Sequence, residues 1–192
     1  MTILTKSEQL SPRIPIKPSI SGLITLPRLT KGGIPNINGY TYTEEAFDNA
    51  MKNYIMKSGI VCLAPEILGI DDIDDKLTVK EIAKFNDAVY TQFHSKGAND
   101  KYLFGNVEDW NENTITFKYI KSDIGEKYLP LIYTDTKINM RYMVDTPSIK
   151  KEITSMGIIL FDITVIPFDD IRDDYDEDIC KLYDKFRERS KV

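Results

Sequence analysis

Only a few side chains in this sequence have the chemistry that catalysis or metal binding requires. The chain contains one histidine, His94, and two cysteines, Cys62 and Cys180. A general base at neutral pH is most often a histidine, but the small and polar stretch Ser95-Lys96-Gly97 beside His94 predicts a solvated loop. One histidine and two distant cysteines supply too few ligands for a zinc site. The two thiols are typical of reduced core residues, although a single disulfide between them is also conceivable.

An acidic run near the C-terminus has part of a calcium-binding pattern. Asp174, Asp176 and Asp178 match the first three ligand positions of a calcium loop. The sixth position is then Ile179, where the sharp turn needs glycine, and the twelfth is Lys185, where the ion needs glutamate. The pattern therefore excludes an EF-hand. It favours a solvated start of the final helix, where carboxylates complement the helix dipole.

Composition excludes several further classes of function. Hydrophobic residues make up 42% and charged residues 29% of the chain, which is a globular balance. The net charge of -5 argues against direct nucleic-acid binding, which needs clustered lysines and arginines. No apolar run approaches the roughly 18 residues of a transmembrane helix, and the N-terminus has no signal-peptide pattern. Gly32-Gly33 belongs to no phosphate-binding motif, so we expect no cofactor.

The N-terminal residues 1–19 are expected to form an extended arm. Pro12, Pro15 and Pro18 recur at three-residue spacing, which fixes the backbone and removes donors that a helix needs. The arm is a candidate subunit contact, in which these prolines dock on a neighbouring copy or another protein. The alternative is an unattached leader.

The remaining chain alternates between strand and helix signals. Alternating or continuous apolar runs predict strands at 19–26, 60–63, 102–107, 114–120, 137–144, 149–153 and 158–166. Apolar stripes at helical spacing predict helices between Thr43 and Gly59, over 123–133 and over 176–189. The run 158–166 is apolar enough to be central in a sheet. Residues 78–94 fit either a helix or a strand.

The order of several short motifs carries further information. Asn36-Ile37-Asn38-Gly39-Tyr40-Thr41-Tyr42 precedes a helix, and Gly59-Ile60-Val61-Cys62-Leu63-Ala64-Pro65 follows it. Two strand motifs come next, Leu103-Phe104-Gly105-Asn106-Val107 and Ile115-Thr116-Phe117. Asn139-Met140-Arg141-Tyr142 lies on a later strand, and Phe161-Asp162-Ile163 precedes the closing Pro167. This order resembles that of the tailed-phage prohead (capsid-maturation) proteases, which are similar in fold to the herpesvirus assemblin proteases.

The resemblance implies a site without its reactive groups. Ala64 stands where the family's catalytic histidine would be, in a His-Pro pair. Asn139 and Met140 stand at the two serines of a Ser-Ser-Arg-Gly signature, whereas Arg141 is retained. A serine protease needs a hydroxyl nucleophile and a base that activates it. No catalytic residue is therefore expected, and Ala64, Asn139 and Met140 mark a degenerate site.

The resemblance also implies a fold and a division of the chain. The expected class is α+β, with a mostly antiparallel, partly closed sheet or barrel, flanking helices and the N-terminal arm. Residues 20–168 would form the prohead-protease-like domain. Residues 169–192 would form an acidic segment and a C-terminal amphipathic helix packed on that domain.

A non-enzymatic phage protein is the function that these expectations favour. The chain would be a capsid-associated or decoration protein of the virion, present in the host cytoplasm during assembly. Its partners would be the major capsid protein or other virion proteins, without nucleic acid or membrane, and a homo-oligomer is conceivable. One alternative is an active maturation protease that uses His94 with Ser95 or Ser155. Another is a capsid-assembly chaperone or scaffold partner.

Overall fold

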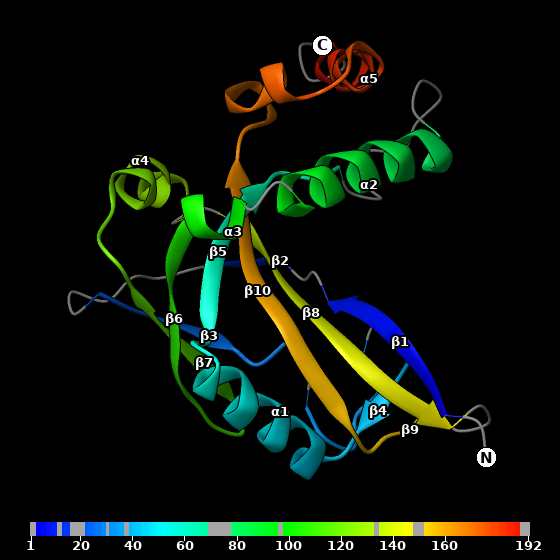
Figure 1. Cartoon of the computed structure of the whole chain (residues 1–192), viewed down its shortest axis with the longest axis vertical. Coiled ribbons are helices and arrows are strands. Elements are labelled where there is room, and N and C mark those ends of the chain that lie inside the picture. The colour runs from blue at the N-terminus through cyan, green and yellow to red at the C-terminus, as the bar shows by residue number, and fades with distance from the viewer. Residues whose placement is uncertain are drawn as a thin grey trace. The chain divides into compact units, whose positions relative to one another are not determined.

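The computed structural model describes most of the chain as strands and helices (Figure 1). The described residues are 3–10, 13–15, 22–29, 31–36, 39–68, 78–95, 98–132, 135–147 and 152–188. The strands are β1 (Ile3–Leu10), β2 (Arg13–Pro15), β3 (Leu23–Pro27), β4 (Thr41–Tyr42), β5 (Ile60–Pro65), β6 (Leu103–Trp110), β7 (Thr114–Tyr119), β8 (Asp135–Pro147), β9 (Glu152–Ile153) and β10 (Met156–Ile166). The helices are α1 (Glu44–Met56), α2 (Val79–Ser95), α3 (Ala98–Lys101), α4 (Asp123–Ile132) and α5 (Glu177–Arg187), with short 3-10 helices η2 (Phe168–Asp170) and η3 (Arg172–Asp174).

The chain divides into two compact units. The first unit comprises Met1–Cys62 and Leu103–Ile163, and the second comprises Leu63–Tyr102 and Thr164–Val192. The boundaries fall inside β5 and β10. The first unit holds most of the strands with α1 and α4, whereas the second holds α2, α3 and α5.

The main sheet has eight strands and is open. Its order is β1-β8-β10-β5-β6-β7-β3, and β2 also pairs with β8. The α+β class is confirmed, but the expected partly closed sheet or barrel is wrong, because the sheet is open. Closure would require the edge strands to pair, whereas β1 and β3 end the strand order at opposite edges. Among the described residues, β4 and β9 form a separate, parallel two-stranded sheet.

The central position of the apolar run 158–166 is confirmed. β10 lies between β8 and β5 in the strand order (Figure 1), and every residue from Leu160 to Ile166 is buried. A strand that is covered on both faces has no polar-out positions, which explains its continuous apolar run. Asp162 is the exception in this apolar run, because its side chain is a carboxylic acid and yet has no exposed surface.

The N-terminal residues join the sheet of their own chain. β1 pairs antiparallel with β8 from Ile3 opposite Pro147 to Leu10 opposite Met140. β2 pairs with the other end of β8, with Pro15 opposite Asp135. The backbone is thus extended where it is described, and Pro12 and Pro18 lie outside the described residues. Docking of this segment on another subunit stays a prediction.

Helix α1 begins at the predicted N-cap. The Thr43 hydroxyl accepts a hydrogen bond from the Ala46 N–H at 3.2 Å, and Glu44 and Glu45 occupy the first turn. The predicted stripe is the buried face of the helix and consists of Ala46, Phe47, Ala50, Met51 and Tyr54. This face holds α1 against the sheet strands of the first unit.

The β6–β7 hairpin explains the glycine of the Leu103-Phe104-Gly105-Asn106-Val107 motif. Gly105 pairs with Tyr119, and a Cβ atom at Gly105 would lie 2.2 Å from the backbone oxygen of Lys118. Only glycine therefore permits this approach of the two backbones. The turn is organised by Asn111, whose side-chain oxygen accepts hydrogen bonds from the N–H groups of Asn113 and Thr114 at 2.9 and 3.0 Å.

The second unit settles the ambiguous residues 78–94, which form helix α2. Thr78 and Glu81 form a capping box, in which the Glu81 N–H donates to the Thr78 hydroxyl at 3.3 Å and the Thr78 N–H donates to the Glu81 carboxylate at 2.9 Å. This reciprocal pair satisfies donors that would otherwise be unpaired at the first turn. Among the described residues, no helix is long and apolar enough to span a bilayer.

Aromatic side chains form the core of the second unit. Phe168 of η2 packs against Phe85 of α2 and Tyr183 of α5, with ring centroids 5.2 and 4.6 Å away. Lys185 and Glu81 join α5 to α2 by an ion pair of 2.8 Å. The α2 and α5 helices are therefore held by both ring packing and charge (Figure 1).

Candidate functional site

The positions that the resemblance matches to the two serines lie in the core of the first unit. Asn139 of β8 donates a hydrogen bond from its amide to the carboxyl group of Asp162 on β10 at 2.5 Å. Neither residue has exposed surface. A buried amide–carboxyl pair satisfies polar groups that would otherwise destabilise the core. The Asn139 amide cannot replace the serine, because an amide nitrogen is not acylated as a serine hydroxyl is.

Both faces of β8 are covered at this point. Adjacent residues of a strand point to opposite faces, and Asn139 and Met140 both have no exposed surface. A substrate thus has no open face of the strand to approach at these two positions. Arg141, which the resemblance matches to the arginine of the signature, is half-buried and aligned with Gln9 of β1.

Ala64 lies on the part of β5 that belongs to the second unit and is fully buried. Its methyl group can neither accept nor donate a proton. Asn139 and Met140 belong to the first unit, so the convergence of Ala64 with them stays a prediction.

A loop turn anchors the start of the Asn-x-Asn-Gly motif to β8. The Asn36 amide donates to the Tyr142 hydroxyl at 2.9 Å, and its side-chain oxygen accepts from the Tyr40 N–H at 3.1 Å. Gly39 has a φ of 76°, which favours glycine at this position. The motif therefore has a structural role in the first unit, since it fixes the loop next to Tyr142.

Tyr54 of α1 joins two sheet strands through its hydroxyl. The hydroxyl donates to the Ile60 backbone oxygen and accepts from the Phe161 N–H at 3.3 Å. Burial raises the pKa of this hydroxyl well above its usual value, while the bond from Phe161 acts in the opposite direction. The group therefore remains a protonated donor that joins α1, β5 and β10.

A Tyr54→Phe substitution should lower the free energy of unfolding by about 1–3 kcal/mol, because it leaves a buried carbonyl and a buried N–H without this partner. Urea unfolding followed by circular dichroism measures the loss. Tyr119→Phe is the matched control, since the Tyr119 hydroxyl is buried with no hydrogen-bond partner among the residues described. Equal stability of the two variants would contradict the assigned role of Tyr54.

The predicted solvated loop at His94 is wrong, because the residue lies in the last turn of α2. Its ring is half-buried against Tyr90 and Phe93, at centroid distances of 4.3 and 5.4 Å. The Ser95 hydroxyl donates to the Gln92 backbone oxygen at 3.0 Å, a local helix-end bond. These contacts give His94 a packing role and Ser95 a capping role.

The acidic residues near the C-terminus are exposed and surround a short helical turn. Asp174 ends η3, and Asp176 and Asp178 flank the start of α5. Arg172 forms a two-pronged ion pair with Asp184, at 2.6 and 2.7 Å, which lowers the pKa of the Asp184 carboxyl through hydrogen bonding. In the described part of the chain, no three His, Cys, Asp or Glu side chains are grouped to hold a metal ion.

The cysteines are both free thiols in the structure. Cys62 is fully buried on β5, as expected of a core thiol. Cys180 is half-buried on α5, where its sulfur lies 3.7 Å from the Arg172 backbone oxygen. The disulfide that was conceivable from the sequence is therefore not formed.

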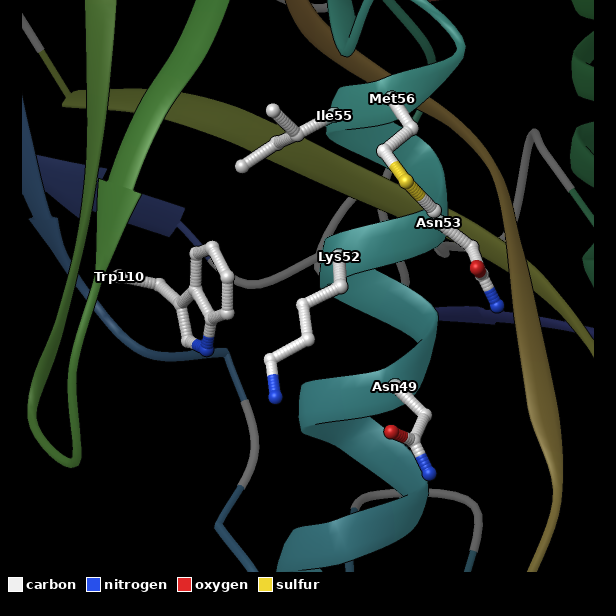
Figure 2. Close-up of a pocket in the computed structure, with 6 residues that line it drawn as sticks. All are labelled: Asn49, Lys52, Asn53, Ile55, Met56 and Trp110. Atoms are coloured by element: carbon white, nitrogen blue, oxygen red, sulfur yellow. The ribbon is translucent and has the colours of Figure 1, made fainter.

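An open groove of about 600 Å³ runs along α1 beside the β6–β7 hairpin. Figure 2 shows Trp110 facing the helix across this groove. Its indole N–H donates to Asp48 at 3.0 Å, which fixes the ring. The groove is lined by Asn49, Lys52, Asn53, Ile55, Met56 and Trp110. Lys52 is the only charged lining group, so the groove has no acid–base pair for catalysis.

The functional interpretation of the sequence missed Asp162 as the partner of Asn139. The signal was present, because Asp162 is the one ionisable residue in the apolar run 158–166. An ionisable residue in such a run needs a partner when it is buried. The partner itself is 23 positions earlier in the chain and cannot be identified from local pattern.

Comparisons with protein-family models, with curated proteins and with solved structures found no match to this chain.

Proposed function

We propose that the chain is a non-enzymatic virion protein, associated with the capsid and built on an inactive fold of the prohead-protease kind. The proposal rests on the motif order together with the chemistry at the matched positions. A buried amide bonded to a carboxyl group stands at one serine position, and a buried thioether at the other. Neither group can form the acyl intermediate of a serine protease, and both are enclosed.

An active protease that uses His94 has less support. Ser95 is adjacent to His94 on the helix, and its hydroxyl already donates to the Gln92 carbonyl group. The imidazole packs against the rings of Tyr90 and Phe93. A triad needs the base within hydrogen-bond reach of the nucleophile.

Quantitative mass spectrometry of purified mature particles tests the structural role. We expect the chain at a stable stoichiometry relative to the coat protein, retained through washing at high salt. Absence from mature particles would remove the proposal. Presence in immature particles alone would indicate an assembly chaperone.

A cleavage assay tests the enzymatic alternative separately. The purified chain is incubated with the coat and scaffold proteins, and the products are followed by intact-mass measurement. We expect intact substrates for the natural chain and for His94→Ala alike. Cleavage that is lost in His94→Ala would establish a protease and overturn the inactive assignment.

A further inference from the structure

Strand β1 forms one edge of the main sheet. It is paired with β8 on one side, and no other strand of the described chain is paired with it. It runs for eight residues, Ile3–Leu10, without a proline. A strand edge of this length presents backbone donors and acceptors that can bind another extended chain.

The two charged residues of β1 have defined register positions opposite β8. Lys6 is aligned with Val144 of β8 and Glu8 with Tyr142, and both β8 residues are almost fully buried. The two opposite charges lie two residues apart in the sequence of the strand. A partner strand is favoured when it supplies the opposite charge at both register positions, and like charges there oppose pairing.

The sequence of β1 is complementary to itself when it is reversed about Ser7. An antiparallel pair of two β1 strands centred there aligns Lys6 with Glu8 and Leu4 with Leu10. A pair centred on Lys6 would instead align two lysines, which is unfavourable. A twofold axis at Ser7 therefore pairs each charge with its opposite and each leucine with a leucine.

We propose that β1 is a homotypic interface, through which two copies of this chain pair their edge strands antiparallel about Ser7. The interface forms a continuous sheet across the dimer axis and matches opposite charges twice. It goes beyond the proposed virion role and does not depend on it. The contact is made by Leu4–Leu10 rather than by the prolines that follow.

Charge reversal tests the interface in the full-length chain. Lys6→Glu or Glu8→Lys replaces both attractive pairs with repulsive ones, so sedimentation velocity should show a dimer dissociation constant raised by about tenfold or more. The double variant Lys6→Glu/Glu8→Lys restores both pairs and should recover dimerisation. An equimolar mixture of the two single variants should form a heterodimer, detected by native mass spectrometry.

Lys118→Glu is the matched control, since it makes the same charge change at an exposed position of β7. It should leave the dissociation constant unchanged. A monomer at every concentration would overturn the proposal. A dimer that tolerates both single reversals, or single variants that do not recover on mixing, would overturn it as well.

A crosslink tests the position of the twofold axis. Directly opposite residues of an antiparallel pair have Cα atoms about 4.5–5.5 Å apart, within the range of a disulfide. Ser7→Cys, in a chain with Cys180→Ser, should therefore form a disulfide-linked dimer on mild oxidation. Gln9→Cys in the same background is the control and should not, because its opposite residue is Thr5. Crosslinking by Gln9→Cys in place of Ser7→Cys would overturn the centre at Ser7.

Discussion

Gly105→Ala is expected to destabilise the first unit by about 3–5 kcal/mol or to prevent it from folding. The added Cβ would lie 2.2 Å from the Lys118 backbone oxygen and 3.0 Å from its carbonyl carbon. A flexible side chain could rotate away from such a contact, but the backbone of a paired strand cannot move without loss of its hydrogen bonds. The free energy of unfolding, measured by urea titration with circular dichroism, gives the size of the effect.

Gly157→Ala is the matched control, because it adds the same methyl group to another strand of the first unit. A Cβ at Gly157 meets no atom within 4 Å. The free energy of unfolding of Gly157→Ala should therefore stay within about 1 kcal/mol of that of the natural chain. If Gly105→Ala does not fold, resistance to proteolysis in cell lysates compares the two variants. Equal stability or equal protease resistance of the two would contradict the close approach of β6 and β7.

Asn139→Leu is expected to lower the free energy of unfolding by about 2–4 kcal/mol. The change keeps the branched shape of the side chain with a somewhat larger volume, and it removes the amide that donates to Asp162. The carboxyl group would then remain in the core without this donor. Calorimetric or urea unfolding of the purified variant measures the loss.

A double-mutant cycle separates this polar contact from packing. Asp162→Leu alone should also destabilise the chain, whereas Asn139→Leu/Asp162→Leu should recover part of the loss, because an apolar pair needs no hydrogen bond. Asn49→Leu is the control on an exposed position of α1 and should change stability little. Additive effects of the two core substitutions would show that Asn139 and Asp162 do not act as a pair.

The sequence predicted those helices and strands that depend on nearby residues, such as an N-cap or an apolar pattern. Thr43 and the apolar stripe behind it predicted α1, and the continuous run 158–166 predicted a central strand. Periodicity alone does not decide between helix and strand for residues 78–94. The pattern Thr78-Val79-Lys80-Glu81 is a capping-box signal and favours the helix that is observed.

Features that depend on distant partners were not predictable from pattern. The open edge of the sheet depends on β1 pairing with β8, more than a hundred residues away. His94 contacts the rings of Tyr90 and Phe93. These contacts could be predicted only if residues 78–94 were known to form a helix. The role of Asn139 likewise required the strand order that places β10 beside β8.

The contact between Trp110 and Asp48 gives this chain a built-in optical reporter. Trp110 is the only tryptophan, and its indole is held against α1 by a single hydrogen bond. Indole emission therefore reports on one place alone, the junction of α1 with the β6–β7 hairpin. If the second unit unfolds alone, the far-ultraviolet ellipticity falls while the Trp110 emission spectrum stays unaltered. The two signals together therefore reveal whether the two units unfold in one step or in two.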